Sequence, residues 1–257
     1  MEKKYSANFF RDSMPDWKKK KDPWIAQVFY RPLSFYISAF CANRGISANS
    51  VSYFSMLVAI AACACYCMSC HTIHIIGAII VNIWLLLDCV DGNIARSVKA
   101  QPFGEFADAG SSYLLISFIY ITMGYALYNE GGLLFEKGEV IILLMAVFAT
   151  SFDSFARLLY HKYKDGLKSL KEKYPNAVSL DNLNQTKPSK IPSLRDRIGE
   201  AIGIGGFLPA FILLFTCLGM AEFIIYYIFC YNLLKCCYVM YKTITLAIKI
   251  TNKIDAE

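Results

Sequence analysis

The stretch LLLDCVDGNIARSVKAQPFGEFADAGSSYLL, residues 85–115, places carboxylates beside segments apolar enough to cross a membrane. Asp88 and Asp91 stand three residues apart at the end of one apolar run, and Asp108 begins the next. An ionised side chain at membrane depth costs about 2.5 kcal/mol or more, and such residues usually face a polar cavity and mark a functional site. The stretch therefore predicts a bundle of membrane helices with a site near one of its ends.

The chain has 257 residues, of which 56% are hydrophobic. A helix needs about 20 predominantly apolar residues to cross the hydrocarbon core. We therefore expect an all-α, polytopic membrane protein with six transmembrane helices. The six segments with few or no charges are 50–70, 72–90, 108–128, 139–160, 199–219 and 222–245.

A polar region and an amphipathic segment precede these spans. Residues 1–22 are charged and predict a cytoplasmic leader that is flexible or lies on the surface. In residues 23–45, the polar residues Gln27, Arg31, Ser34 and Ser38 recur every three or four positions, which predicts an interfacial amphipathic helix bent near Pro32. Residues 46–247 then form one transmembrane domain, and residues 248–257 form a cytoplasmic tail.

Basic residues are unevenly distributed between the connections. They concentrate in the N-terminal segment, in the turn after the second span, in residues 162–197 and in the tail, whereas the opposite turns contain only Lys137. By the positive-inside rule, both termini and the acidic stretch face the cytoplasm, and we expect a bacterial inner membrane. The formal charge of +6 reflects this rule and attraction to anionic lipids, so no nucleic-acid partner is expected.

The three carboxylates have the chemistry of a site for a hard divalent cation. Asp88 and Asp91 project from a similar helix face, and a turn at Gln101 and Pro102 folds Asp108 back toward them. Their mutual repulsion in one pocket would be severe without cations. Oxygen ligands favour Mg²⁺, Mn²⁺ or Ca²⁺ over zinc.

Small residues and an arginine accompany the carboxylates. Gly92 and Ala95 leave room beside the second span, and Gly104 does so at the start of the third. Arg96 offers a permanently charged donor fork that suits phosphate oxygens. This combination predicts a bound pyrophosphate bridged by metal ions. A purely structural salt-bridge cluster is the alternative, and it explains the glycines poorly.

These residues resemble a known signature. The pattern Asp88-x2-Asp91-Gly92-x2-Ala95-Arg96, followed by Gly104-x3-Asp108, is similar to the signature of the CDP-alcohol phosphotransferase (CDP-alcohol phosphatidyltransferase) family, with seven of its eight defined positions filled. The stretch 47–52, SANSVS, is similar to the segment with which the first span of that family begins.

The resemblance implies a reaction and residue roles. Two divalent ions, Mg²⁺ or Mn²⁺, would grip the pyrophosphate of a CDP-linked alcohol or lipid, and an acceptor hydroxyl would attack the β-phosphorus and release CMP. The acceptor would be a lipid or a phosphorylated alcohol, and the enzyme a homodimer. The expected metal ligands are Asp88, Asp91 and Asp108, and the expected CDP-binding residues are Gly92, Ala95, Arg96, Gly104, Asn49 and Ser52.

The departure from the signature is Ser112, where the family has its last Asp, a metal ligand and the proposed general base. A serine hydroxyl is a poor base at neutral pH. Catalysis could persist with Asp108 assisted by Glu105 and one metal weakly held. Alternatively, the acceptor needs no base because it is already an anion. In the third interpretation the chain binds its ligand but has lost turnover.

A second charged group lies near the end of the fourth span. Asp153 and Arg157 stand four residues apart, and an intrahelical ion pair is the plain explanation. The resemblance also suggests that Arg157 binds an anionic acceptor, helped by Arg195 or Arg197. Lys235 in the last span is expected to be structural.

The predicted function is that of a membrane transferase in phospholipid or lipid-linked glycan synthesis. The alternative is a catalytically impaired family member that binds CDP-lipid or regulates a partner. A transporter would require inverted repeats or matching broken helices, which the sequence does not contain.

Overall fold

The structure is a computed structural model that describes residues 4–174 and 202–254. Within these two ranges it consists of helices and their connections, without a strand. Five helices are long and apolar enough to cross a membrane: α4 (Ala48–Tyr66), α5 (His71–Ser97), α6 (Gly104–Glu130), α7 (Val140–Lys173) and α11 (Glu222–Ile254). The prediction of an all-α polytopic protein is confirmed.

The predicted span 199–219 differs from the other five. Its described part contains α10 (Leu208–Cys217), an apolar helix of 10 residues. A helix of this length rises about 15 Å, roughly half the hydrocarbon core. Residues 199–201 of that span lie outside the described ranges, so the sixth crossing stays a prediction.

The N-terminal residues form ordered short helices. These are α1 (Ala7–Asp12), α2 (Asp16–Lys21), the π-helical turn η1 (Ala26–Tyr30) and α3 (Arg31–Asn43). Ser6 caps α1 by accepting a hydrogen bond from the Phe9 backbone N–H, and Phe10 is only 1% exposed against α3 and α4 residues. A flexible leader would not bury this ring. The expected irregularity near Pro32 takes the form of the π-turn that precedes α3.

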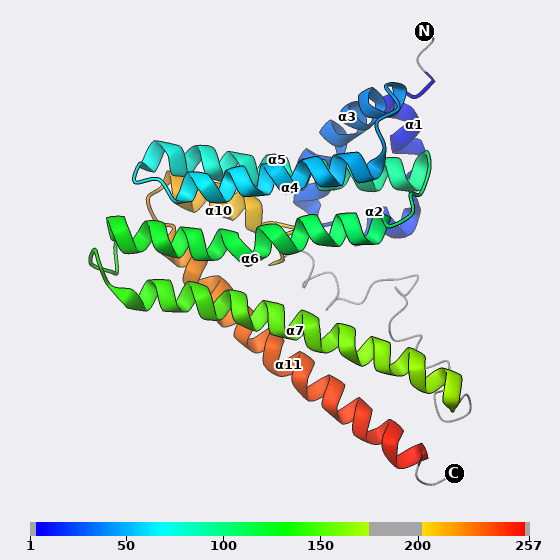
Figure 1. Ribbon diagram of the computed structural model, residues 1–257. Helices are drawn as coiled ribbons and strands as arrows, with labels where there is room; N and C mark the ends of the chain where they lie inside the picture. The colour runs from blue at the N-terminus through cyan, green and yellow to red at the C-terminus, as the bar shows by residue number, and fades with distance from the viewer. Residues whose placement is uncertain (1–3, 175–201, 255–257) are drawn as a thin grey trace.

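The long helices form a layered bundle (Figure 1). Helix α4 packs against both α5 and α6, α7 packs against α6 and α11, and α10 packs against α5. The α4–α5 and α6–α7 turns lie at one end, whereas α1, the α5–α6 turn and the last turns of α11 lie toward the other. We call the latter the signature end, because the α5–α6 turn, which lies between Asp91 and Asp108 in the chain, is there.

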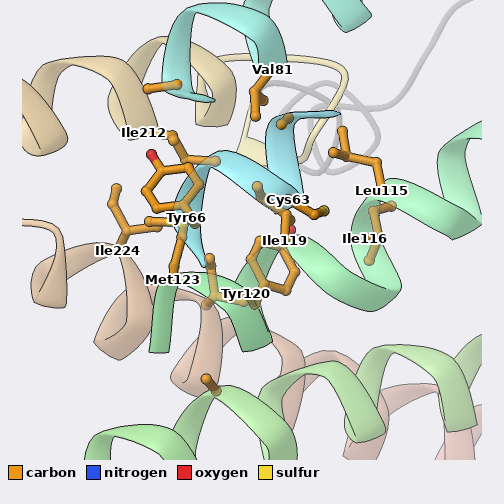
Figure 2. Close-up of a cluster of buried hydrophobic side chains, with 14 of the residues drawn as sticks. Cys63, Tyr66, Val81, Leu115, Ile116, Ile119, Tyr120, Met123, Ile212 and Ile224 are labelled. Atoms are coloured by element: carbon orange, nitrogen blue, oxygen red, sulfur yellow. The ribbon is translucent and has the colours of Figure 1, made fainter. Parts of the chain in front are cut away.

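The core fills the space between these layers. Figure 2 shows aromatic and aliphatic side chains from α4, α5, α6, α10 and α11 meeting in one cluster. Within it, the Tyr66 and Thr216 hydroxyls lie 2.9 Å apart, so a buried phenol is satisfied by a helix 150 positions away. This contact ties the last residue of α4 to α10, at the end of the bundle opposite the signature end.

Two glycines allow helices to approach closely. A Cβ atom at Gly124 on α6 would lie 2.5 Å from the Cβ of Ala146 on α7, and one at Gly77 on α5 would lie 2.8 Å from the Cβ of Cys65 on α4. Neither contact can be relieved by rotating a flexible side chain, because both neighbours are Cβ atoms. Small residues at such positions let membrane helices pack backbone to backbone.

Gly124→Ala is expected to destabilise the protein by about 1–3 kcal/mol, since α6 and α7 must separate to admit the methyl group. The measurement is the thermal unfolding midpoint in detergent. Gly166→Ala is the matched control, because a Cβ at Gly166 on α7 meets nothing within 4 Å. If Gly124→Ala unfolds at the same temperature as the wild type, the close approach of α6 and α7 is not as described.

Candidate functional site

The signature carboxylates lie where α4, α5 and α6 meet. Asp91 is 5% exposed and accepts a hydrogen bond from the Ser52 hydroxyl at 2.6 Å. Asp88 is half-buried and Asp108 is exposed, and these two carboxylates lie close enough to interact. Helix α4 therefore contributes to the site through the contact of Ser52 with Asp91.

A cavity of about 710 Å³, the signature cavity, opens beside Asp91 and Asp108. Its size is that of a typical small-ligand site. Every residue predicted to bind CDP lines it: Asn49, Ser52, Gly92, Ala95, Arg96 and Gly104. Glu105, the predicted assistant of Asp108, also lines it. The structure thus brings the donor residues of the prediction together around one space, whereas their roles stay proposals.

Asp88 departs from the expected arrangement, because it lines a different cavity from Asp91 and Asp108. Residues three apart on a helix point about 60° from one another, so neighbouring carboxylates can diverge. In residues 4–174 and 202–254, no group of three or more His, Cys, Asp or Glu side chains is placed to hold a metal ion. The three carboxylates nevertheless interact with one another, because Asp88 acts on both Asp91 and Asp108. A single site shared by all three stays a prediction.

The donor atoms nevertheless suit a hard divalent ion. Oxygen is the only ligand type that Asp88, Asp91 and Asp108 offer. The Asn49 side-chain oxygen near Gly104 is buried and has no hydrogen-bond partner. Buried polar atoms are normally paired, so this oxygen is available to a ligand of the cavity. Metal ligation by the three aspartates stays a proposal that this chemistry supports.

Gly92 and Arg96 form one unit on α5. A Cβ at Gly92 would lie 2.8 Å from the Arg96 Nη1 atom, so only glycine lets the guanidinium fold back over the helix. Arg96 Nη2 donates to the Asn93 side-chain oxygen at 3.2 Å. We predicted that Gly92 leaves space for a ligand. In the structure, the Arg96 guanidinium occupies this space and lines the cavity.

Ser112 stands one helical turn after Asp108, half-buried, and lines neither the signature cavity nor the cavity beside Asp88. Its neighbour Ser111 is 3% exposed, lies 2.5 Å from the Ser55 hydroxyl and accepts from the Trp84 indole N–H at 2.8 Å. Ser111 therefore joins α6 to α4 and α5. The sequence alone does not reveal these contacts, because spacing does not pair residues that are 27 and 56 positions apart.

The cavity beside Asp88 has a volume of about 340 Å³ and is lined by cations, so we call it the basic cavity. Its charged residues are Lys18, Arg31, Arg157 and Lys235, together with Asp22, Asp88 and Asp153. The predicted Asp153–Arg157 ion pair is confirmed, at 2.5 Å. Lys235, expected to be structural, also contacts Asp153 at 2.6 Å and lines the cavity. Arg195 and Arg197, the other predicted acceptor residues, lie outside the described residues.

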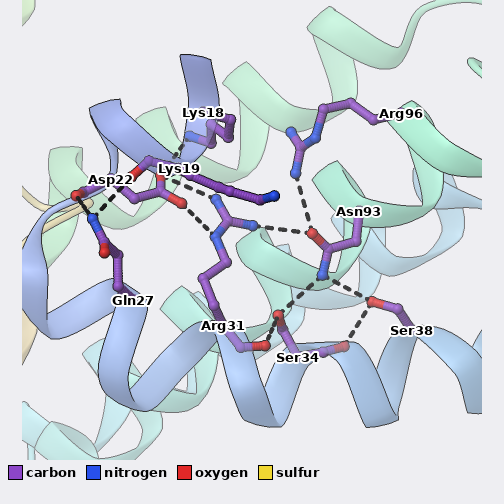
Figure 3. A network of polar contacts seen from close by, with 9 residues as sticks. All are labelled: Lys18, Lys19, Asp22, Gln27, Arg31, Ser34, Ser38, Asn93 and Arg96. Atoms are coloured by element: carbon purple, nitrogen blue, oxygen red, sulfur yellow. Dashed lines mark hydrogen bonds and ion pairs between the residues drawn. The ribbon is translucent and has the colours of Figure 1, made fainter. Parts of the chain in front are cut away.

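A polar network ties the N-terminal segment to the signature helix (Figure 3). The Arg31 guanidinium donates to the two Asp22 carboxylate oxygens at 2.7 and 3.2 Å and to the Asn93 oxygen at 3.1 Å. Asn93 in turn donates to Ser34 and Ser38. The polar stripe predicted for residues 23–45 thus faces α5 in part, because Arg31, Ser34 and Ser38 are all buried.

Asp22, which precedes the membrane helices, remains a carboxylate at neutral pH. Burial raises its pKa, but the hydrogen bond and charge of Arg31, with the charge of Lys18, outweigh burial and hold the pKa below its ordinary value. The stability that this pairing contributes is present above the ordinary pKa and is lost as the pH falls through the lowered one. The contacts of Asp22 with Arg31 and Lys18 are therefore present at physiological pH.

One of the comparisons with known proteins identifies a family. The family model "CDP-alcohol phosphatidyltransferase" matches residues 46–177, more than half of the chain, from the start of α4 through α7. A comparison with curated proteins finds no match. Together with the seven signature positions, six of which line one cavity, this match identifies the chain as a member of the CDP-alcohol phosphatidyltransferase family.

Proposed function

We propose that the chain is an active, divalent-metal-dependent transferase that releases CMP from a CDP-linked donor. Family membership implies transfer of a phosphoalcohol group from a CDP-alcohol to an alcohol acceptor in lipid synthesis. The observation that supports activity most is the signature cavity, where Asp91, Asp108, Gly92 and Arg96 face the same space. CDP-diacylglycerol, CDP-choline, CDP-ethanolamine and CDP-glycerol are all possible donors.

In this proposal, the signature cavity holds the CDP part of the donor. Asp88, Asp91 and Asp108 would hold Mg²⁺ or Mn²⁺, which when bound neutralises pyrophosphate charge and polarises the phosphoryl group. Arg96 offers its donor fork to phosphate oxygens. Gly92 makes room for the Arg96 guanidinium, Gly104 keeps the backbone accessible, and Asn49 supplies an unpaired oxygen.

The two cavities give donor and acceptor separate approaches. Phosphoryl transfer requires the attacking and leaving oxygens to lie roughly in line, on opposite sides of the phosphorus. Asp91 and Asp108 line the signature cavity, and Asp88 lines the basic cavity. We place CMP on the first side and the acceptor on the second. The acceptor oxygen then bonds to the β-phosphorus, the bond to the CMP oxygen breaks, and the hydroxyl proton leaves to a base.

Two interpretations of Ser112 concern the general base and the acceptor, and each is supported by residues that line a cavity. Glu105 lines the signature cavity with Asp108, which supports the interpretation that another carboxylate assists catalysis. Arg157 and Lys235 line the basic cavity, which supports an acceptor that is anionic, such as a phosphorylated alcohol. The two features are compatible. Cytoplasmic orientation, a bacterial inner membrane and a homodimer stay predictions.

A binding module is the alternative function, and Ser112 is the observation that favours it. Such a protein would bind CDP-lipid or regulate a partner without releasing CMP. The experiment that separates the two functions is CMP release from a series of CDP-alcohols by the purified protein in detergent or liposomes, with and without Mg²⁺ or Mn²⁺.

Asp91→Asn is expected to lower CMP release by at least about 100-fold, because the amide keeps the size of the carboxylate but removes the charge that would bind metal. The measurement is initial rate at saturating Mg²⁺ with a donor that the wild type uses. Asp165→Asn is the control, since Asp165 is exposed on α7 and lines neither cavity. Unchanged turnover in Asp91→Asn would contradict the metal site.

Ser112→Asp restores the missing signature carboxylate, and we expect it to lower the Mg²⁺ concentration for half-maximal rate by about tenfold or more. Ser112→Asn, which adds bulk without charge, should not reproduce the shift. A rate that falls in Ser112→Asp, with the Mg²⁺ requirement unchanged, would speak against a weakly held metal and for repulsion of an anionic acceptor.

A further inference from the structure

Two carboxylates in the basic cavity are each held by two cations. On one wall, Asp22 contacts Arg31 at 2.7 Å and Lys18 at 2.9 Å. On the other, Asp153 contacts Arg157 at 2.5 Å and Lys235 at 2.6 Å. All six residues line the same cavity. The first group comes from the N-terminal segment, and the second comes from α7 and α11.

The charges of this cavity do not cancel. Each carboxylate neutralises one of its two cations, so each wall keeps one positive charge. Asp88 is the remaining charged residue that lines the cavity. If Asp88 binds metal as proposed, its charge is compensated there. The cavity then presents two unneutralised cations to its contents, which suits a phosphate group with two negative charges.

Lys18 is the cation of the N-terminal wall that can contact such a group. Arg31 is 6% exposed and uses its Nε, Nη1 and Nη2 atoms on Asp22 and Asn93. The Lys18 ammonium has three N–H donors. Its contact with Asp22 uses one of them, and its side chain is 22% exposed. Its charge also acts on both Asp88 and Asp108, so it lies near the signature carboxylates.

A structural role alone does not account for Lys18. Arg31 already pairs with both Asp22 oxygens, so the carboxylate is satisfied without the lysine. Asp22 instead positions Lys18, which lies four residues earlier on helix α2 and contacts the Asp22 carboxylate. An exposed lysine on a flexible stem would otherwise have no fixed place at the cavity wall.

We propose that Lys18 is a substrate-binding residue that donates to a phosphate group in the basic cavity, and that Asp22 is its positioning residue. The inference rests on the proposed function for the place of the substrate. Residue 18 precedes the family match at 46–177, so this contact is supplied by a segment that the family model does not cover. The phosphate belongs either to the CDP donor or to a phosphorylated acceptor.

The test measures binding of two probes, CDP and inorganic phosphate, to the purified full-length chain in detergent with Mg²⁺, by isothermal titration calorimetry. We expect Lys18→Gln to weaken binding of at least one probe by about tenfold or more, the effect of losing one charge-assisted hydrogen bond. Lys18→Arg should recover most of the affinity. Lys20→Gln should bind as the wild type does, because Lys20 is exposed on the same helix and lines neither cavity.

The two probes distinguish the sources of the phosphate. Loss for CDP alone assigns Lys18 to the donor pyrophosphate, and loss for inorganic phosphate alone assigns it to an acceptor phosphate. Equal affinities in Lys18→Gln and wild type for every probe that the wild type binds would overturn the inference. So would a loss that Lys20→Gln shares, or a loss accompanied by a lower unfolding temperature and not recovered by Lys18→Arg.

Failure of the proposed function gives a different result. If the wild type binds CDP and releases CMP while Lys18→Gln behaves identically, only the role of Lys18 falls. If the wild type binds neither probe and releases no CMP, the donor site itself is wrong, and the role of Lys18 falls with it.

Discussion

The cost of an ionised carboxylate among apolar helices governs the arrangement of the signature end. Each carboxylate has polar partners that offset this cost: Asp91 accepts from Ser52, Asp22 accepts from Arg31, and Asp153 contacts Arg157 and Lys235. Each partnership also joins two elements, α4 to α5, the α2–η1 connection to α3, and α7 to α11. The charges therefore fix the walls of both cavities as well as their electrostatic character.

The closely packed helices make this arrangement rigid. Helix α4 lies between α5 and α6, so Ser52, Asp91 and Asp108 are held by three helices that cannot shift independently. Glycines 77 and 124 let α5 approach α4 and α6 approach α7. Membrane helices gain little hydrophobic stabilisation from meeting each other, so packing and polar contacts hold them together. The core in Figure 2 packs together the same helices, α4, α5 and α6, that carry the site residues.

Local patterns predicted the long helices and the residues that line the signature cavity, because apolar length and motif spacing are properties of neighbouring residues. Local patterns did not predict the contact between Arg31 and Asn93, which are 62 positions apart. Nor did they predict the contact between Lys235 and Asp153, which are 82 positions apart. Spacing placed Asp88 and Asp91 near one another, and they do interact, but it did not show that they line different cavities. Long-range pairing depends on how the helices pack, and a single sequence does not show that.

The central claim is that the two cavities belong to one metal-dependent transfer reaction. The most direct measurement is CMP release by the wild-type chain from CDP-diacylglycerol, CDP-choline, CDP-ethanolamine and CDP-glycerol, titrated with Mg²⁺ and with Mn²⁺. We expect CMP from at least one donor, and no release when EDTA removes the metal. Binding of CDP without CMP release from any donor and acceptor pair, or release that persists in EDTA, would contradict it.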